Sequence, residues 1–392
     1  MTGTTLMVWA FWISLTIVVY TYFLFPAILA LRALFCKKTI RTRDHTPRVS
    51  LIIVAYNEVD VIKKKLDNVF SLNYPKELLE VIVASDGSDD GTNELVKNYE
   101  APRLQLLELP RQGKNRALNA AVNRAEGEIL VFTDADSILA PDALRNLLAP
   151  LASPDVGGVS GDYRYPRDIS RNSGENSYWG YDRNLKRFQS RAGSITSVTG
   201  ALYAISRCLF RQVPNGVTDD FFVCSQVPSA HRRLIFEPKA VAYGPISESM
   251  EEEFLRKVRV VTRGLRSVWT MRHLLNPFRY GFYSLQLFTH KVLRRLMVVP
   301  LLILSICAPV LWSANNFYLL VTVLQIGFGS AAMTGFLLRR RRIGRLKPFA
   351  LASFFVMVNT ATALALLNLV RGLDYDVWAP RRTPLPSGNV AQ

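Results

Sequence analysis

The chain is poor in the residues that build metal clusters and disulfide frameworks. Its 392 residues include four cysteines and four histidines, and no CxxC or paired Cys/His spacing indicates a zinc site. The four cysteines are scattered, which predicts free thiols and fits a reducing cytoplasm. They are Cys36, Cys208, Cys224 and Cys307.

The two common glycine-rich phosphate loops are also missing. The chain has no GxxxxGK[ST] and no GxGxxG sequence, which disfavours a P-loop ATPase and a dinucleotide-dependent enzyme. A phosphate group would therefore be met by a metal ion, by helix N-termini, or by Lys114 and Arg116. Lys114 follows Arg111–Gly113, which we expect to be a flexible loop, whereas Arg116 is equally consistent with a solvated charge on a helix.

Charge of either sign is absent from long apolar stretches. Residues 1–31, 297–338 and 348–370 contain no charged side chain. At about 1.5 Å per residue, these lengths suffice for one, two and one crossings of a ~30 Å hydrocarbon layer. The turn between the second and third crossing is expected at Ser313–Asn316. We therefore predict four transmembrane helices in preference to four buried helices of a soluble protein.

The first apolar stretch is expected to be a retained anchor and not a cleaved signal peptide. No basic residue precedes it, and its apolar part, residues 6–31, exceeds the usual h-region of about 7–15 residues. Pro26 predicts a kink within it.

The net charge of +17 would fit a nucleic-acid-binding protein, but much of the excess lies beside the apolar stretches. Basic clusters in such places mark the cytoplasmic side of a membrane and favour anionic lipid headgroups. We therefore predict a multi-pass protein of the plasma or inner membrane that binds no nucleic acid. The large middle region is expected in the cytoplasm, and both chain ends outside. The basic residues are Arg32, Lys37, Lys38, Arg41 and Arg43, then Arg339–Arg342, Arg345 and Lys347.

Five segments follow from these patterns. An anchor with a basic linker (1–45) precedes a globular domain (46–250). Amphipathic interfacial helices (251–295) lead to three transmembrane helices (296–371). The proline-rich tail (372–392) is expected to be largely disordered.

The globular domain alternates between short apolar runs and helical patterns. Such alternation predicts an α/β fold with a mostly parallel sheet that is covered on both faces. The expected strands are Val49–Ala55, Leu79–Ala84, Leu104–Leu109 and Ile129–Thr133. The expected helices are Glu58–Ser71, one that begins at Gly91, Lys114–Ala125 and Asp142–Leu151.

Acidic residues follow three of these strands. Glu58 follows the first, Asp86 the second, and Asp134 and Asp136 the fourth. Carboxyl ends of parallel strands meet at the crevice where open α/β sheets bind ligands. Turn-forming propensity accounts for the segment around Asp86, but not for the other three acids. Because Mg²⁺ is commonly held by one or two carboxylates and substrate phosphates, we predict a nucleotide-diphosphate pocket.

Several short motifs, in this order, resemble those of the family 2 glycosyltransferases. The similarity covers about Pro47 to Trp269, and the flanking apolar stretches resemble the membrane branch that includes cellulose and hyaluronan synthases. The motifs are Val49–Glu58, Ser85–Asp90, Gly113–Asn119, Asp134–Asp136, Thr199–Ala201, Thr218–Asp220 and Arg256–Arg259.

The resemblance implies a GT-A (Rossmann-like) fold and an inverting hexosyltransferase that uses a UDP-sugar. Asp134 and Asp136 would be the DxD pair that holds Mg²⁺ or Mn²⁺ on the diphosphate. Asp220 would be the catalytic base, or Asp219 if the register slips by one. Capping of the helix that follows by Thr218, Asp219 or Asp220 is a further expectation. On the nucleotide, Tyr56 and Glu58 would line the pocket, Asp86 would contact base or ribose, and Lys114 would offset the charge of the departing UDP.

Arg256 and Arg259 resemble the QxxRW motif, which binds the diphosphate and shapes the acceptor channel. Here Arg replaces the Gln and Val260 replaces the Trp. Since the Trp is associated with the acceptor sugar of processive synthases, processive polymerisation is not implied. Residues 251–275 also have the pattern of an amphipathic helix in the headgroup layer, where both arginines would be solvated.

Two further segments are candidates for the acceptor side. Tyr163, Arg164 and Tyr165 would border the acceptor, and Arg167–Gln189, which is polar, is expected to be an irregular loop over the site.

The sequence thus predicts a membrane glycosyltransferase of cell-surface polysaccharide or glycolipid biosynthesis. The acceptor is lipid-linked or a saccharide, and a separate export protein is an expected partner. A non-catalytic, nucleotide-binding regulator of polysaccharide export is the alternative. A transporter is disfavoured, because no charged residue within the spans marks a substrate path.

Overall fold

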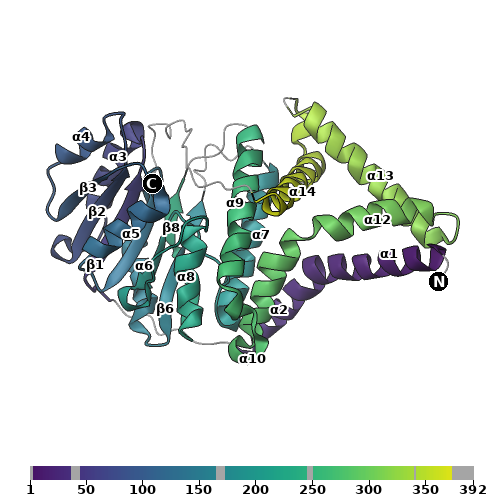
Figure 1. Cartoon of the computed structure of the whole chain (residues 1–392), viewed down its shortest axis with the longest axis horizontal. Helices are drawn as coiled ribbons and strands as arrows, with labels where there is room; N and C mark the ends of the chain where they lie inside the picture. The colour runs from purple at the N-terminus through teal and green to yellow at the C-terminus, as the bar shows by residue number, and fades with distance from the viewer. Residues whose placement is uncertain (1–2, 37–44, 165–172, 245–249, 340, 373–392) are drawn as a thin grey trace.

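The computed structural model describes residues 3–36, 45–164, 173–244, 250–339 and 341–372. A sheet domain lies at one end, and long helices extend from the other (Figure 1). Some predictions concern residues outside the described ranges. They are the basic residues Lys37, Lys38, Arg41, Arg43 and Arg340, the proposed acceptor residue Tyr165, the start of the predicted loop (167–172) and the tail after Gly372.

The domain is built on one mixed sheet of eight strands in the order β3-β2-β1-β4-β7-β6-β8-β5. The first four strands in this order are mutually parallel. They begin where the sequence predicts, and two of them run on into Asp86 and Asp134. They are β1 (Val49–Ala55), β2 (Leu79–Asp86), β3 (Leu104–Leu109) and β4 (Ile129–Asp134). The prediction of an α/β sheet is confirmed.

The other half of the sheet is largely antiparallel, and its strands were not predicted. Strand β7 pairs antiparallel with both β4 and β6, β6 pairs parallel with β8, and β5 closes the edge antiparallel to β8. The bounds are β5 Ile138–Leu139, β6 Val156–Arg164, β7 Tyr203–Ser206 and β8 Arg233–Tyr243.

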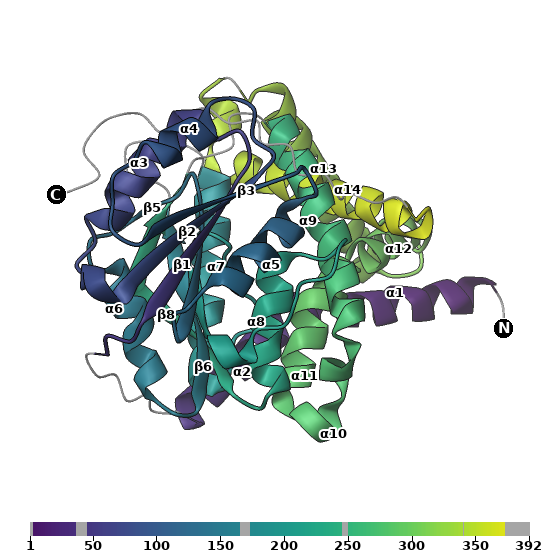
Figure 2. The same cartoon turned by 60° about the vertical axis from the view of Figure 1, so that its left-hand side comes forward.

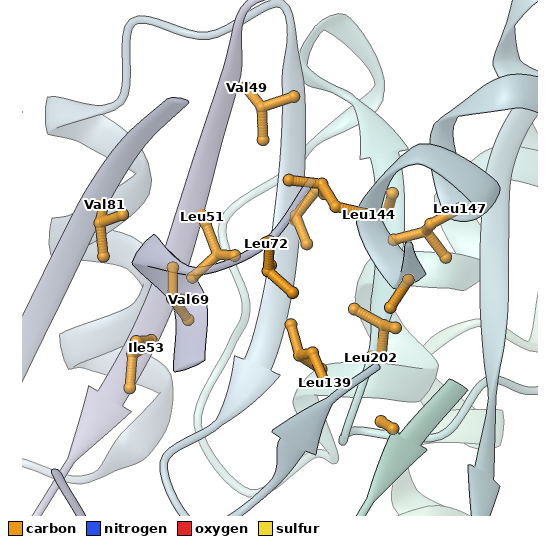
Figure 3. Packing of buried hydrophobic residues seen from close by; sticks show 14 of the residues in the cluster. Val49, Leu51, Ile53, Val69, Leu72, Val81, Leu139, Leu144, Leu147 and Leu202 are labelled. Carbon is orange, nitrogen blue, oxygen red and sulfur yellow. The ribbon is translucent and has the colours of Figure 1, made fainter. Parts of the chain in front are cut away.

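Strand β1 is buried along its whole length, because helices cover both faces of the sheet. Leu51 and Ile53 point into one apolar cluster, and Ile52 and Val54 into the other. Figure 3 shows the first cluster, in which Val69 and Leu144 pack over the strands. Figure 2 shows α3 and α6 on one side of the sheet and α5 and α8 on the other. Their bounds are α3 Val59–Phe70, α5 Lys114–Arg124, α6 Ala143–Leu148 and α8 Asp219–Ser229, and the short α4 is Thr92–Lys97.

Two long helices lie crosswise between the sheet domain and the apolar helices (Figure 1). One is α9 (Met250–Thr270), whose Val258 and Val261 pack against Ala361 and Ala365 of α14 (Lys347–Val370). The other is α7 (Ser173–Ala192), so the expectation of an irregular loop over Arg167–Gln189 was wrong from Ser173 onward. Leu185 and Ala192 of α7 pack on Leu29, which explains why a mostly polar segment is helical.

Three helices are long and apolar enough to cross a membrane in the described part of the chain, or four if a bent pair is one span. The three are Gly3–Phe35, α13 (Asn316–Leu337) and α14. Within the first, a π-helical turn (Tyr20–Leu24) joins α1 (Gly3–Val19) to α2 (Phe25–Phe35) just before Pro26, as a proline in a helix commonly requires.

The remaining predicted span is shorter than expected. Helix α12 (Val298–Val310) has 13 residues, about 20 Å of helix, against a ~30 Å hydrocarbon layer. It qualifies only together with Phe282–Arg295, from which it is bent by 55°. The segment Phe282–Arg295 consists of α11 (Phe282–Leu287), a π-helical turn (Phe288–Val292) and a 3-10 turn (Leu293–Arg295). It is preceded by α10 (Pro277–Tyr280).

Candidate active site

The carboxyl ends of β1, β2 and β4 meet at one edge of the sheet. The register pairs Ala55 with Ser85 and Val54 with Asp134, so the residues that follow β1 and β2 lie beside the end of β4. Glu58 is 4% exposed at the start of α3, where its backbone N–H donates to Thr92 Oγ1 at 2.9 Å. The predicted acids of these three strands are therefore brought together by the sheet itself.

Asp86 is almost fully buried and holds the loop that follows β3. Its carboxylate accepts hydrogen bonds from the backbone N–H groups of Gln112 (2.8 Å) and Gly113 (2.9 Å) and pairs with Arg111. The Arg111 guanidinium in turn covers the Tyr56 ring, 3.4 Å from its centroid. The loop Arg111–Gly113 is thus held against the sheet, whereas the sequence suggested a flexible segment.

This close approach requires a glycine at the end of β2. Gly87 has a φ of +73°, and a Cβ there would lie 2.8 Å from the backbone nitrogen of Arg111. Asp86 and Gly87 together therefore hold Arg111 where it stacks on Tyr56, beside the ends of β1 and β2.

Lys114, the first residue of α5, connects the two halves of the site. Its Nζ lies 3.1 Å from Asp134 Oδ1 and 3.2 Å from Asp219 Oδ2. Burial alone would lower the pKa of Lys114, but these two carboxylates outweigh it and raise the pKa above the ordinary value. The lysine stays charged and ties the end of β4 to the start of α8.

The DxD acids are partly exposed, unlike Asp86. Asp134 ends β4, Asp136 follows two residues later, and Gly200 lies beside Asp134, since a Cβ there would lie 3.4 Å from Asp134 Oδ2. No group of three or more His, Cys, Asp or Glu side chains that could hold a metal occurs among the described residues. A pair of carboxylates nevertheless suits Mg²⁺ or Mn²⁺ whose remaining ligands are phosphate oxygens and water.

Sequence reasoning missed a buried lysine beneath this pair. Lys65 of α3 is 0% exposed, and its ammonium donates to Thr133 Oγ1 (2.7 Å), Ser137 O (2.7 Å) and Ser137 Oγ (3.2 Å). Burial lowers the pKa of Lys65 to about 7, while the charges of Asp134 and Asp136 oppose the shift. Three hydrogen bonds hold the turn that carries both acids, and the helical pattern of α3 gave no sign that one of its lysines points inward.

Asp219 and Asp220 occupy the first turn of α8, where carboxylates are favoured by the helix dipole. Thr218, the residue before α8, does not cap the helix with a side-chain hydrogen bond. Asp220 Oδ1 accepts a hydrogen bond from the Phe221 N–H at 2.6 Å. Burial, followed by the neighbouring charge of Asp219, raises the pKa of Asp220 above its ordinary value, while Lys291 and Lys114 lower it. A carboxylate with a raised pKa is a better proton acceptor.

Helix α9 holds the loop that leads into α8. Arg263 Nη2 donates to Val217 O at 2.6 Å, and Ser267 Oγ accepts from the Thr218 N–H at 2.9 Å. Neither Arg263 nor Ser267 was singled out from the sequence. Arg263 lies four residues after Arg259, on the same side of the helix. This spacing is the sequence feature from which a role for Arg263 at the site could have been predicted.

The two arginines predicted to meet the diphosphate lie nearer the start of α9. Arg256 Nε is 2.7 Å from Glu253 Oε2 on the same helix, and Arg259 is partly exposed. Further along the same helix, Arg263 reaches the site loop at Val217.

Comparison with protein families gives one match in this region. Residues 50–213 match the model of glycosyl transferase family 2. The matched range contains Tyr56, Glu58, Asp86, Lys114 and both DxD acids.

Two sets of curated relatives carry the same description. The chain is 28% identical over 235 residues to the poly-beta-1,6-N-acetyl-D-glucosamine synthase of Staphylococcus epidermidis RP62A, covering 56% of each protein. It is 27% identical over 228 residues to the synthase of that name from Staphylococcus aureus MSSA476, covering 55% of this chain and 54% of the other. The similarity thus spans about half the length of these relatives.

One solved structure is similar over nearly the whole chain. The mannosyltransferase PcManGT from Pyrobaculum calidifontis, in complex with GDP-Man and Mn²⁺, superposes with a TM-score of 0.71 at 24% identity. The superposition covers 92% of this chain and 99% of that one. The GT-A fold predicted from the sequence is confirmed.

Proposed function

Because residues 50–213 match the model of glycosyl transferase family 2, we propose that this chain is an enzyme of that family and transfers a sugar, with inversion, from a UDP-sugar to a lipid-linked or polysaccharide acceptor. The observation that carries the proposal is the double ion pair of Lys114, which ties Asp134 to Asp219 and so sets the DxD acids beside the first turn of α8. A donor site and a base at one place are what direct sugar transfer requires.

The donor side is assigned by the chemistry of its residues. Asp134 and Asp136 would hold Mg²⁺ or Mn²⁺, which, when bound, neutralises charge on the diphosphate. Lys114 would donate to a phosphate oxygen as UDP departs, since its ammonium already lies between carboxylates at this point. The nucleoside would rest against the Arg111–Tyr56 stack, near Glu58 and Asp86. Arg256 and Arg259 remain candidates for the diphosphate.

Asp220 is proposed as the base. Its carboxylate takes the proton from an acceptor hydroxyl, and the oxygen attacks the anomeric carbon on the face opposite UDP. The bond from that carbon to the phosphate oxygen breaks, and its electron pair leaves with UDP, so the anomeric configuration inverts. The raised pKa of Asp220 suits this proton transfer.

The position of α9 supports catalysis at the cytoplasmic face of the membrane. This helix separates the sheet domain from the apolar helices and packs on α14 (Figure 1). We propose that residues 46–250 form the catalytic domain, residues 251–295 lie at the interface, and residues 296–371 form three spans after the anchor in 1–45. The biological role would be cell-surface polysaccharide or glycolipid biosynthesis, with a separate export protein where a polymer is made.

A donor screen tests the proposal. The purified protein, supplied with membrane lipid extract, is given a panel of nucleotide sugars, and released nucleotide is measured with Mn²⁺ and after chelation by EDTA. UDP-N-acetylglucosamine comes first because of the relatives' names, and GDP-mannose is included because of PcManGT. We expect metal-dependent UDP release from at least one UDP-sugar and its loss with EDTA. Release from GDP-mannose alone would contradict the uridine assignment.

A further inference from the structure

Basic side chains gather on the membrane side of Asp220, on elements that the donor site does not use. Lys186 belongs to α7, and Lys291, Arg294 and Arg295 lie in the two short turns before α12. We call these four residues the basic cluster.

A histidine within the cluster is neutral. Arg294 Nη1 lies 3.1 Å from His290 Nε2, and because a guanidinium can only donate, this nitrogen accepts. The other ring nitrogen, Nδ1, lies 3.0 Å from Thr196 Oγ1 and carries the ring proton. His290 therefore orders the cluster without adding charge.

An ion pair is buried within the cluster. Lys186 Nζ pairs with Asp182 Oδ2 at 3.1 Å, and both side chains are largely buried. Burial would raise the pKa of Asp182, but the charges of Lys186 and Arg294 and the hydrogen bond from Lys186 oppose it, and the pKa lies well below the ordinary value, so Asp182 stays ionised. Beside this pair, the cluster holds three more basic residues, and one of them, Lys291, lowers the pKa of Asp220.

Lys291 lies beside the first turn of α8. Its ammonium lies 5.8 Å from the centre of the Phe221 ring, the residue after Asp220. Within the part of the chain that the structure describes, it forms neither a hydrogen bond nor an ion pair. The charges of Asp220 and Asp182 act on this partly buried ammonium without direct contact. A ligand anion in direct contact would stabilise it further.

The surroundings place this ammonium at the junction with the membrane helices. Thr289, two residues earlier, has its Oγ1 3.2 Å from the Tyr20 hydroxyl of the anchor helix. The Arg295 guanidinium packs against Gly264 of α9, where a Cβ would lie 2.4 Å from Nη2. A molecule anchored in lipid can present an anion here while the next group along it reaches α8.

We propose that the basic cluster, through Lys291, binds the phosphate of a lipid-phosphate-linked acceptor and so presents the acceptor's sugar hydroxyl to Asp220. This inference rests on the proposed function and narrows its acceptor to one class.

Binding of dodecyl phosphate in an uncharged detergent tests the inference, with inorganic phosphate and phosphatidylglycerol nanodiscs as parallel arms. We expect saturable binding of dodecyl phosphate that weakens at least tenfold in Lys291→Met and returns in Lys291→Arg. Arg342→Met, which removes an exposed basic residue between α13 and α14, is the matched control and should bind as the wild type does.

Each other outcome overturns the inference. Equal affinity in Lys291→Met and the wild type would remove Lys291 from the site. Equal weakening in Arg342→Met, or equal binding of phosphatidylglycerol nanodiscs, would indicate general attraction to anionic lipid. Binding of inorganic phosphate as tight as that of dodecyl phosphate would show that the site does not recognise the lipid chain. UDP binding with Mn²⁺ is measured on the same samples, because its loss in the wild type would count against the proposed function and not against the acceptor site alone. The thermal midpoint of each variant shows whether it is folded.

Discussion

At the scale of single residues, the site is a row of charges that set one another's properties. Lys114 lies between Asp134 and Asp219, Asp220 adjoins Asp219, and Lys291 follows on the membrane side. The row runs from the proposed donor site to the proposed acceptor site. A change at one position should therefore be measurable as a change in protonation at another.

The pH dependence of Lys114→Met tests this coupling. A base must be deprotonated to act, so kcat/KM falls as the pH drops through the pKa of Asp220. Lys114 lowers that pKa, which burial and Asp219 raise. Its removal should therefore move the acidic limb of the pH–kcat/KM profile to higher pH, besides lowering kcat at least about tenfold through the lost phosphate contact.

Arg116→Met is the matched control, since this residue lies on the same helix and contacts Gln112 rather than an acid of the site. Its acidic limb should coincide with that of the wild type. An unchanged limb in Lys114→Met would mean that Asp220 is not the titrating base.

At the scale of elements, α9 positions the base by holding the loop before α8. We expect Arg263→Gln to lower kcat for transfer about tenfold, because the loop loses its hydrogen bond to Val217 and Asp220 becomes less well placed. UDP affinity should stay unchanged. Arg272→Gln, an exposed arginine just beyond the same helix, should leave both quantities as they are. Weaker UDP binding with normal kcat in Arg263→Gln would place this arginine on the donor instead.

Prediction from sequence succeeded for elements with a strong local pattern. The runs that became β1, β2 and β4 are mostly apolar because both of their faces are buried, and the meeting of the acids at their ends follows from parallel pairing. It failed for the antiparallel strands and for α7, whose form depends on distant partners such as Leu29.

The same limit applies to single side chains of the site. Lys65 is read as a surface residue on a helical pattern, and only the turn at Ser137 explains its burial. Arg263 is likewise recognisable only once the loop at Val217 lies beside α9.

At the scale of the whole molecule, α12 decides which side of the membrane each later loop faces. If the bent pair Phe282–Val310 crosses, the basic residues between α13 and α14 face the cytoplasm, as the positive-inside rule requires. If it re-enters on the same side, these residues face outward. The charge pattern therefore favours a crossing despite the short helix.

Cysteine labelling checks this arrangement. Ser313→Cys and Arg342→Cys are made in a background without the exposed Cys36 and Cys208, in intact cells. A membrane-impermeant maleimide should label the cysteine at position 313 and should reach the one at 342 only after the cells are opened. The reverse pattern would show that α12 is re-entrant and that the C-terminal end lies inside.

The central claim, that the DxD acids and Asp220 serve one reaction, is tested most directly by comparing transfer with donor binding in Asp220→Asn. We predict that purified Asp220→Asn binds UDP with Mn²⁺ as the wild type does but transfers no labelled sugar from a UDP-sugar to acceptor. Asp136→Ala, measured alongside, should lose metal-dependent UDP binding as well. Normal turnover by Asp220→Asn would contradict the account.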